Sequence, residues 1–213
     1  MIQKTKAFVE EKFKTEGTGH DWWHMYRVWK LAKHIAATEK GVDVSLVELG
    51  ALLHDIADWK FHDGSMEAGP KAAREWLEGL KVNEDIILQV EDIVRNVSFK
   101  GAKVQQHMQS KEGQIVSDAD KLDALGAIGI ARTFAYGGSH HTPIYDPSIK
   151  PVQHTTFNDY KNSKSHTINH FYEKLLLLKD KLYTKTARDM ATHRHAFMEQ
   201  YLEEFYKEWE GEL

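Results

Sequence analysis

Hydrophobic residues recur at helical spacing along most of this chain. The pattern is clearest between Asp21 and Thr38, where apolar side chains return every three or four residues, at Trp22, Met25, Val28, Trp29, Ala32 and Ile35. A second stretch runs through Leu46, Leu49, Leu52, Leu53 and Ile56. Asp43 or Ser45 can cap its start. No segment alternates convincingly with the period of a β-strand, so we expect an all-α fold.

Further helices are predicted on both sides of these two stretches. An N-terminal helix should end at residues 17–19, and a long single helix should cover 115–136 despite Gly126 and Gly129. The other predicted helices span residues 66–80, 84–97, 165–182 and 186–208. Residues 99–112 are expected to be a polar connection. Residues 137–162 hold three of the four prolines and should form a long functional loop.

The chain length of 213 residues suits a single domain over residues 1–213. We divide it into a core over about 18–136 and a C-terminal helical part over about 163–210. With 41% hydrophobic residues, the chain can bury a substantial core.

The net charge of −4 gives no sign of a nucleic-acid-binding surface. The absence of cysteine excludes disulfides, thiolate zinc sites and cysteine nucleophiles, and it suits a reducing compartment. The N-terminus does not resemble a signal peptide, and no apolar run approaches the ~20 residues of a membrane span. We therefore expect a cytoplasmic protein with no membrane or nucleic-acid partner. Its apolar helical surface is compatible with a homodimer.

The adjacent pair His54 and Asp55 is the strongest chemical signal. Both residues lie in the apolar string ALLHDIAD, where a carboxylate is costly unless it is paired or bound to a metal. An imidazole and a carboxylate together suit a divalent ion. The pair therefore predicts part of a metal site.

Two further ligands are sought on other helices. The apolar stripe beside His24 should aim its imidazole inward, although a buried structural histidine has the same pattern. A carboxylate is expected from the string QIVSDADKLDALG, which offers Asp118, Asp120 and Asp123. Helical periodicity alone does not decide among these three.

The strings GHDWWHMYRVWKLA, LLHDIADWKF, SDADKLDALGAIGIART and HTINHFYEKLL resemble the HD-domain phosphohydrolase superfamily. They are similar to a small bacterial subgroup that includes manganese-dependent nucleoside triphosphate pyrophosphohydrolases, and the resemblance covers roughly residues 18–200. It implies a helical bundle around one divalent ion, with manganese favoured over magnesium, iron, cobalt, nickel or zinc. It also implies four ligands in chain order, namely His24, His54, Asp55 and Asp118.

The resemblance assigns Asp58 as the proton acceptor, because acidic residues often occupy this offset after the ligand pair. A surface carboxylate paired with Lys60 is the alternative for Asp58. Lys121 lies one helical turn after Asp118 and should contact a phosphate. Further candidates for substrate binding are His20, Asp21, Lys60, Asn96, His166, His170 and Lys174, of which the last three should lie along one helix face. Arg132 fits a surface salt bridge better than a phosphate contact.

The expected function is metal-dependent hydrolysis of a phosphoester or phosphoanhydride bond in a small nucleotide. A nucleoside or deoxynucleoside triphosphate would give the monophosphate and pyrophosphate. The alternatives are a 5′-nucleotidase, a phosphodiesterase of messenger nucleotides, and a non-catalytic nucleotide sensor that keeps the fold.

Overall fold

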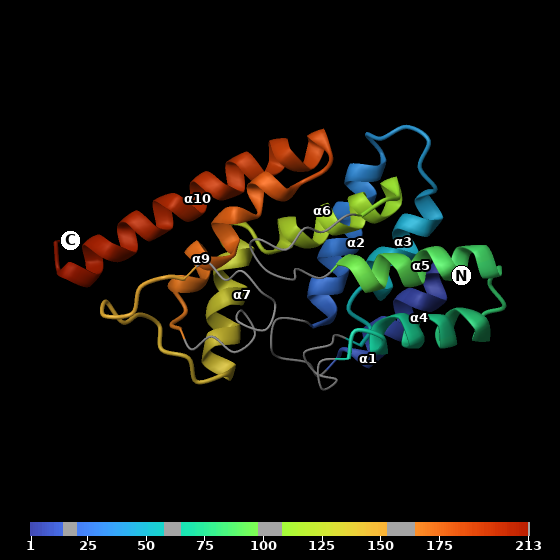
Figure 1. The fold of residues 1–213 in the computed structure, drawn as a ribbon, viewed down its shortest axis with the longest axis horizontal. Helices are drawn as coiled ribbons and strands as arrows, with labels where there is room; N and C mark the ends of the chain where they lie inside the picture. Colours follow the sequence, from blue (N-terminus) through green and yellow to red (C-terminus); the bar gives the residue numbers. More distant parts are fainter. Residues whose placement is uncertain (15–20, 58–64, 98–107, 153–164, 213) are drawn as a thin grey trace. The chain divides into compact units, whose positions relative to one another are not determined.

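Figure 1 shows the fold in a computed structural model, which describes residues 1–14, 21–57, 65–97, 108–152 and 165–212. The regular elements in these ranges are all helical, so the prediction of an all-α fold is confirmed. The α-helices are α1 (Ile2–Lys12), α2 (Trp22–Ala36), α3 (Val44–Leu53), α4 (Ala68–Gly79), α5 (Glu84–Val97), α6 (Lys111–Asp123), α7 (Gly126–Ser139), α9 (Asn169–Glu173) and α10 (Lys185–Glu210). Two short 3₁₀ segments, η2 (Leu175–Leu177) and η3 (Lys179–Lys181), follow α9.

The chain forms two compact units, and the boundary falls inside α6. The described residues up to Asp120 belong to the first unit, and those from Lys121 onward belong to the second. Within the described ranges, no helix is both long and apolar enough to span a bilayer.

The core of the first unit is built by α1 to α5 and the part of α6 up to Asp120. Helix α2 packs on α3, α4 packs on α5, and α3 also contacts α1 and α5. A Cβ on Gly50 of α3 would lie 3.1 Å from Ile93 and 3.3 Å from Val116, so a glycine allows α5 and α6 to approach α3 closely. The fully buried side chains in this core include Met25, Val28, Leu49, Leu52, Leu53, Ile93 and Val116.

A charge cluster at the surface joins α4 to α5. Arg74 of α4 donates hydrogen bonds to Glu78, Glu84 and Glu91. These bonds raise the pKa of the guanidinium, with the bond to Glu91 contributing most. The bonds from Arg74 to Glu84 and Glu91 join the polar surface of α4 to that of α5.

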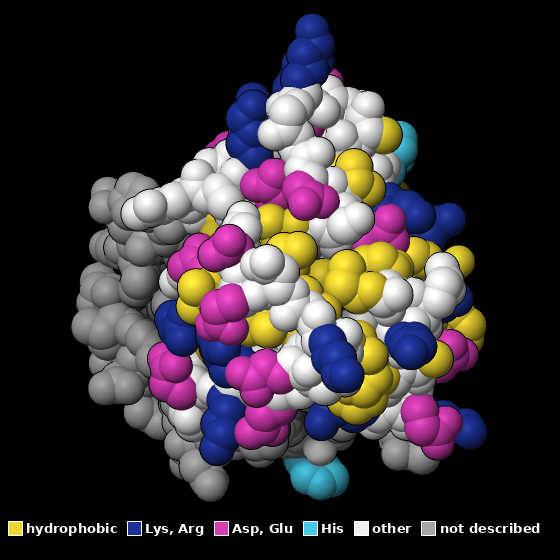
Figure 2. Space-filling view, turned by 90° about the vertical axis from the view of Figure 1, so that its right-hand side faces the viewer, with side chains coloured by type: hydrophobic (Ala, Val, Ile, Leu, Met, Phe, Trp, Pro, Cys, Tyr) yellow, Lys and Arg dark blue, Asp and Glu magenta, His cyan; other side chains and the backbone are white. Residues whose placement is uncertain are grey.

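Figure 2 shows hydrophobic side chains gathered near the middle of one face, among lysine, arginine and acidic side chains. In the first unit, the large apolar residues that are at least two-fifths exposed include Met1, Trp23, Val44 and Leu88. The homodimer expected from such surface stays a prediction.

The prediction of one helix over 115–136 is wrong, because α6 ends at Asp123 and α7 begins at Gly126. Gly126 adopts a φ of +73°, in the left-handed region that favours glycine. The guanidinium of Arg194 donates to the carbonyl oxygen of Leu122 and so caps the last turn of α6. A Cβ on Gly129 would collide with the backbone of Ala124, so only glycine allows this tight break.

The prediction of one helix over 165–182 is also wrong. Only Asn169–Glu173 is α-helical there, and Lys174 leaves the helix with a φ of −139°. The preceding segment is tied instead to residues 140–152. Thr167 donates through its backbone N and its Oγ1 to the carbonyl oxygen of Pro143, and Asn169 Nδ2 donates to that of Ile149. Bonds to these irregular segments replace the continuous helical bonds that the apolar pattern had suggested.

Candidate metal centre

Helix α2 presents His24 in its first turn. Asp21 is the N-cap of this helix, and its Oδ1 accepts a hydrogen bond from the backbone N of His24 at 2.9 Å. The cap fixes where the helix starts, and the His24 side chain is fully buried. Asp21, a candidate for substrate binding, thus supports the backbone of a predicted ligand.

The predicted helix through Ile56 ends earlier, at Leu53, so His54 and Asp55 lie in the turn after α3 rather than within the helix. The Nδ1 of His54 lies 2.8 Å from the carbonyl oxygen of Ala51. Because a carbonyl oxygen only accepts, Nδ1 carries the proton and Nε2 keeps its lone pair. The helix end thereby orients the imidazole of His54 and sets its tautomer.

Four donor atoms from three segments of the first unit converge at one point. The Nε2 atoms of His24 and His54 are 3.2 Å apart, and Asp55 Oδ2 lies 3.5 Å from each of them. Asp120 Oδ1 lies 3.6 Å from His24 Nε2 and 3.8 Å from His54 Nε2. We call these four side chains the donor cluster.

The spacing of the donor cluster fits a divalent metal ion. Ligand atoms about 2.0–2.2 Å from a metal lie roughly 3–4 Å from one another in tetrahedral or octahedral geometry. Two imidazole nitrogens with carboxylate oxygens suit manganese, iron, cobalt, nickel or zinc. His24, His54 and Asp120 already form a group in which every pair of ligand atoms is within 4.8 Å.

The four side chains of the donor cluster differ in their exposure to solvent. The side chains of His24 and His54 are fully buried, and that of Asp55 is 7% exposed, whereas that of Asp120 is 27% exposed. Asp120 is therefore the member of the donor cluster with the most contact with solvent.

Asp120 is the acidic residue of α6 that the structure brings into the donor cluster. The sequence pattern leaves Asp118, Asp120 and Asp123 open as the ligand from this helix, and the family resemblance favours Asp118. Asp118 is fully buried two residues earlier on the same helix and has an interaction of its own. Its role as a ligand stays a prediction.

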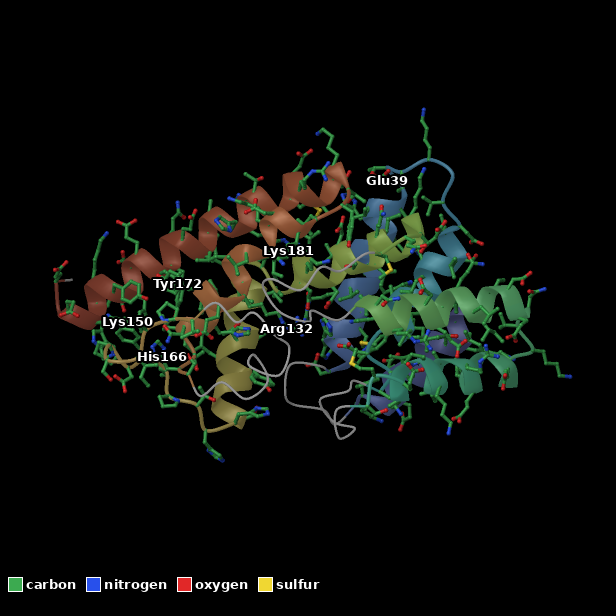
Figure 3. All side chains as sticks on the ribbon, in the orientation of Figure 1. Glu39, Arg132, Lys150, His166, Tyr172 and Lys181 are labelled. Atoms are coloured by element: carbon green, nitrogen blue, oxygen red, sulfur yellow. The ribbon has the colours of Figure 1, made fainter. Side chains whose placement is uncertain are left out.

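Lys121, the predicted phosphate contact, is buried in the second unit. Its Nζ lies 5.3 Å from the centroid of the Tyr183 ring, in a cation–π contact that sequence analysis had not foreseen. Arg132 (Figure 3) pairs with Asp123 at 3.0 Å, so the expected salt bridge is present, although Asp123 is buried.

The other predicted substrate residues were not brought together as expected. Asn96 Nδ2 donates to the backbone oxygen and Oδ1 of Asp92, one turn earlier on α5. His166 (Figure 3) is buried, with Nε2 bonded to the carbonyl oxygen of Ile149 and Nδ1 accepting from the backbone N of Asn169. Of the three residues expected along one helix face, only His170 lies within α9, so that common face does not exist.

The substrate roles of Asn96, His166, His170 and Lys174 stay predictions. His20, Asp58 and Lys60 lie outside the described residues.

Comparisons with known proteins show which family this chain resembles. Residues 22–125, which contain the whole donor cluster, match the HD domain family model. YpgQ of Bacillus subtilis is 34% identical over 212 residues, which cover 99% of this chain and 95% of YpgQ.

Solved structures extend the similarity to the fold. A Lactobacillus plantarum protein superposes with a TM-score of 0.88 at 34% identity, covering 99% of this chain and 97% of that one. An HD-superfamily hydrolase from Bacillus thuringiensis is 43% identical with a TM-score of 0.73, covering 98% and 96%. The structure of YpgQ in complex with ADP has a TM-score of 0.75 at 31% identity, covering 98% and 97%.

Proposed function

This chain belongs to the HD-domain superfamily, and we propose that it is a metal-dependent phosphohydrolase acting on a small nucleotide. The observation that carries the proposal is the donor cluster, in which the two imidazole nitrogens lie 3.2 Å apart and each carboxylate oxygen lies 3.5–3.8 Å from both nitrogens. A divalent ion held there would act as a Lewis acid on a phosphoryl oxygen and on the attacking water.

The proposed division of labour places the ligands on His24, His54 and Asp55, with a further carboxylate from α6. Asp120 is the α6 carboxylate that the geometry favours, and Asp118 is the one that the resemblance favours. Asp58 would accept the proton of the attacking water, and Lys121 would neutralise charge on the bound phosphate.

The nucleotide class is supported by the ADP bound to YpgQ, to which this chain is similar over nearly its full length. ADP contains a phosphoanhydride bond. We propose a nucleoside or deoxynucleoside triphosphate as substrate, with the monophosphate and pyrophosphate as products and manganese as the metal. Hydrolysis of a phosphoester in a nucleoside monophosphate or a messenger nucleotide is the competing reaction within the same class.

The test is a panel of nucleotides incubated with the metal-free protein and added manganese, magnesium, cobalt or nickel. Phosphorus NMR of the products separates pyrophosphate release from release of inorganic phosphate. His54→Ala and Asp55→Ala should abolish turnover. His34→Ala, which removes an exposed histidine elsewhere on α2, should leave turnover unchanged.

Two outcomes would overturn the proposal. If no nucleotide on the panel is hydrolysed with any metal, the chain is not the proposed enzyme, and tight nucleotide binding without turnover would identify a sensor. If His54→Ala and Asp55→Ala retain wild-type rates, hydrolysis does not use the donor cluster.

A further inference from the structure

Three aromatic rings on one face of α2 lie near the ammonium group of a lysine from α1. Lys6 Nζ lies 5.9, 5.8 and 5.7 Å from the ring centroids of Trp22, Tyr26 and Trp29. These distances fall within the range in which a cation is attracted to the face of an aromatic ring. We call the three rings the aromatic cage.

The aromatic cage is braced by contacts of its own. The ring centroid of Tyr26 lies 5.8 Å from those of both Trp22 and Trp29. Trp29 Nε1 also donates a hydrogen bond of 2.8 Å to Glu48 on α3. These contacts fix the positions of the rings relative to one another and to α3.

The aromatic cage and His24 lie on opposite faces of α2. Successive helical residues are turned by about 100°, so His24 points roughly 160–220° away from the three cage residues. Trp22 and Tyr26 also stand two residues before and two residues after His24. Lys6 therefore contacts the first two turns of α2 on the face opposite to His24.

Helix α1 is held on another side as well. The Phe8 ring stacks on Trp76 of α4 with centroids 3.8 Å apart, and Trp76 Nε1 donates to Thr5 Oγ1 at 3.0 Å. Val9 is fully buried, and α1 also packs against α3. Helix α1 therefore joins α2 to α4, which carries none of the donor cluster.

We propose that Lys6 is a positioning residue for the metal centre, whose ammonium group in the aromatic cage fixes the rotation of α2 and so the place of His24. A rotation of α2 by about 20° would move an atom ~6 Å from the helix axis by ~2 Å. That movement would separate His24 Nε2 from His54 Nε2, now 3.2 Å away. The inference rests on the proposed metal binding at the donor cluster.

The test compares Lys6→Met, which keeps the length of the side chain and removes its charge, with Lys6→Arg, which restores a cation. Isothermal titration calorimetry gives the Kd for manganese, and hydrogen exchange of the metal-free protein reports on the amides of residues 22–29. Lys6→Met should weaken manganese binding about threefold to tenfold and speed exchange in α2. Lys6→Arg should stay within about twofold of wild type.

Lys33 provides a matched control within the same helix. Its Nζ lies 4.9 Å from the Trp29 centroid and 3.7 Å from Glu48 Oε1, so Lys33→Met also removes a cation–π contact. Lys33 belongs to α2 itself, so this change does not release α1, and the Kd for manganese should not change.

The proposal is overturned if Lys6→Met binds manganese and exchanges its α2 amides as wild type does, or if Lys33→Met weakens binding equally. Should Lys6→Met fail to fold, Tyr26→Leu removes one cage ring and must weaken binding in the same direction. Wild-type protein that binds no manganese would instead refute the proposed function. The exchange of α2 in the metal-free protein then still decides whether Lys6 holds this helix.

Discussion

His24 Nε2 and His54 Nε2 lie 3.2 Å apart, although thirty residues separate them in the chain. Because Nδ1 of His54 donates to Ala51, its Nε2 accepts the hydrogen bond from His24 in the protein alone. An ion bound by both nitrogens needs a lone pair on each, so metal binding should move the proton of His24 from Nε2 to Nδ1. The Nε2 atoms of His24 and His54 are thus close enough to bind one ion together.

The first prediction concerns the carboxylate from α6. Because Asp120 Oδ1 lies within 3.8 Å of both histidine nitrogens, Asp120→Ala should weaken manganese binding by at least about tenfold. Calorimetry on Asp118→Ala and Asp120→Ala in parallel checks this. Loss of binding in Asp118→Ala with wild-type binding in Asp120→Ala would show that Asp118 is the ligand from this helix.

The second prediction concerns the N-cap of α2. Asp21→Ala should lower the free energy of unfolding by about 1 kcal/mol, because the backbone N of His24 loses its side-chain acceptor and keeps only the longer bond to the backbone oxygen of residue 21. Asp21→Asn keeps a side-chain oxygen and should remain within a few tenths of a kcal/mol of wild type. Urea unfolding of the metal-free protein measures both. Equal losses in the two variants would show that the capping bond is not what stabilises this end.

The third prediction concerns the break between α6 and α7. Gly126→Ala should destabilise the protein by at least about 1–2 kcal/mol, because a side chain is strained at a φ of +73°. The added Cβ would also lie 3.1 Å from the Arg194 side chain. Gly138→Ala, in α7 with no atom within 4 Å of the new Cβ, should be neutral or stabilising by up to about 1 kcal/mol. Thermal unfolding of both variants gives the comparison, and a neutral Gly126→Ala would contradict the assigned backbone.

The fourth prediction concerns pH. Hydrogen bonding and charge attraction from Arg95 lower the pKa of Glu67 below its ordinary value. A carboxyl group with a lowered folded-state pKa stabilises the fold above its unfolded pKa, and this contribution is lost as the pH falls through the folded value. Between pH 6 and pH 3, wild-type protein should therefore lose more stability than Glu67→Gln. Identical losses in urea unfolding at the two pH values would mean that this pair contributes nothing.

The sequence predicted the helices well where one face is apolar and the other polar. The predicted range 84–97 coincides with α5, and Asp43, one of the two cap candidates, caps α3. The breaks were missed because an apolar pattern continues through them. At Gly126 the backbone turns left-handed while Leu122, Leu125 and Gly129 keep helical spacing.

The pair His54 and Asp55 and the partner His24 were predictable because each interrupts an apolar stripe that must face the core. The carboxylate from α6 was not predictable in this way. Residues 115–123 are buried except for the half-buried Asp120, so periodicity gives no preferred face on which to place a ligand. The aromatic cage was not predictable for another reason. Helical periodicity relates residues within one helix, whereas Lys6 lies on α1 and the three rings lie on α2.

The most direct test of the metal centre is anomalous X-ray diffraction from crystals soaked in manganese chloride, recorded at the manganese edge. A manganese ion held by the donor cluster should give a peak about 2.0–2.2 Å from Nε2 of both His24 and His54, with carboxylate oxygens at similar distances. A fully soaked crystal without an anomalous peak between these two histidines would contradict it.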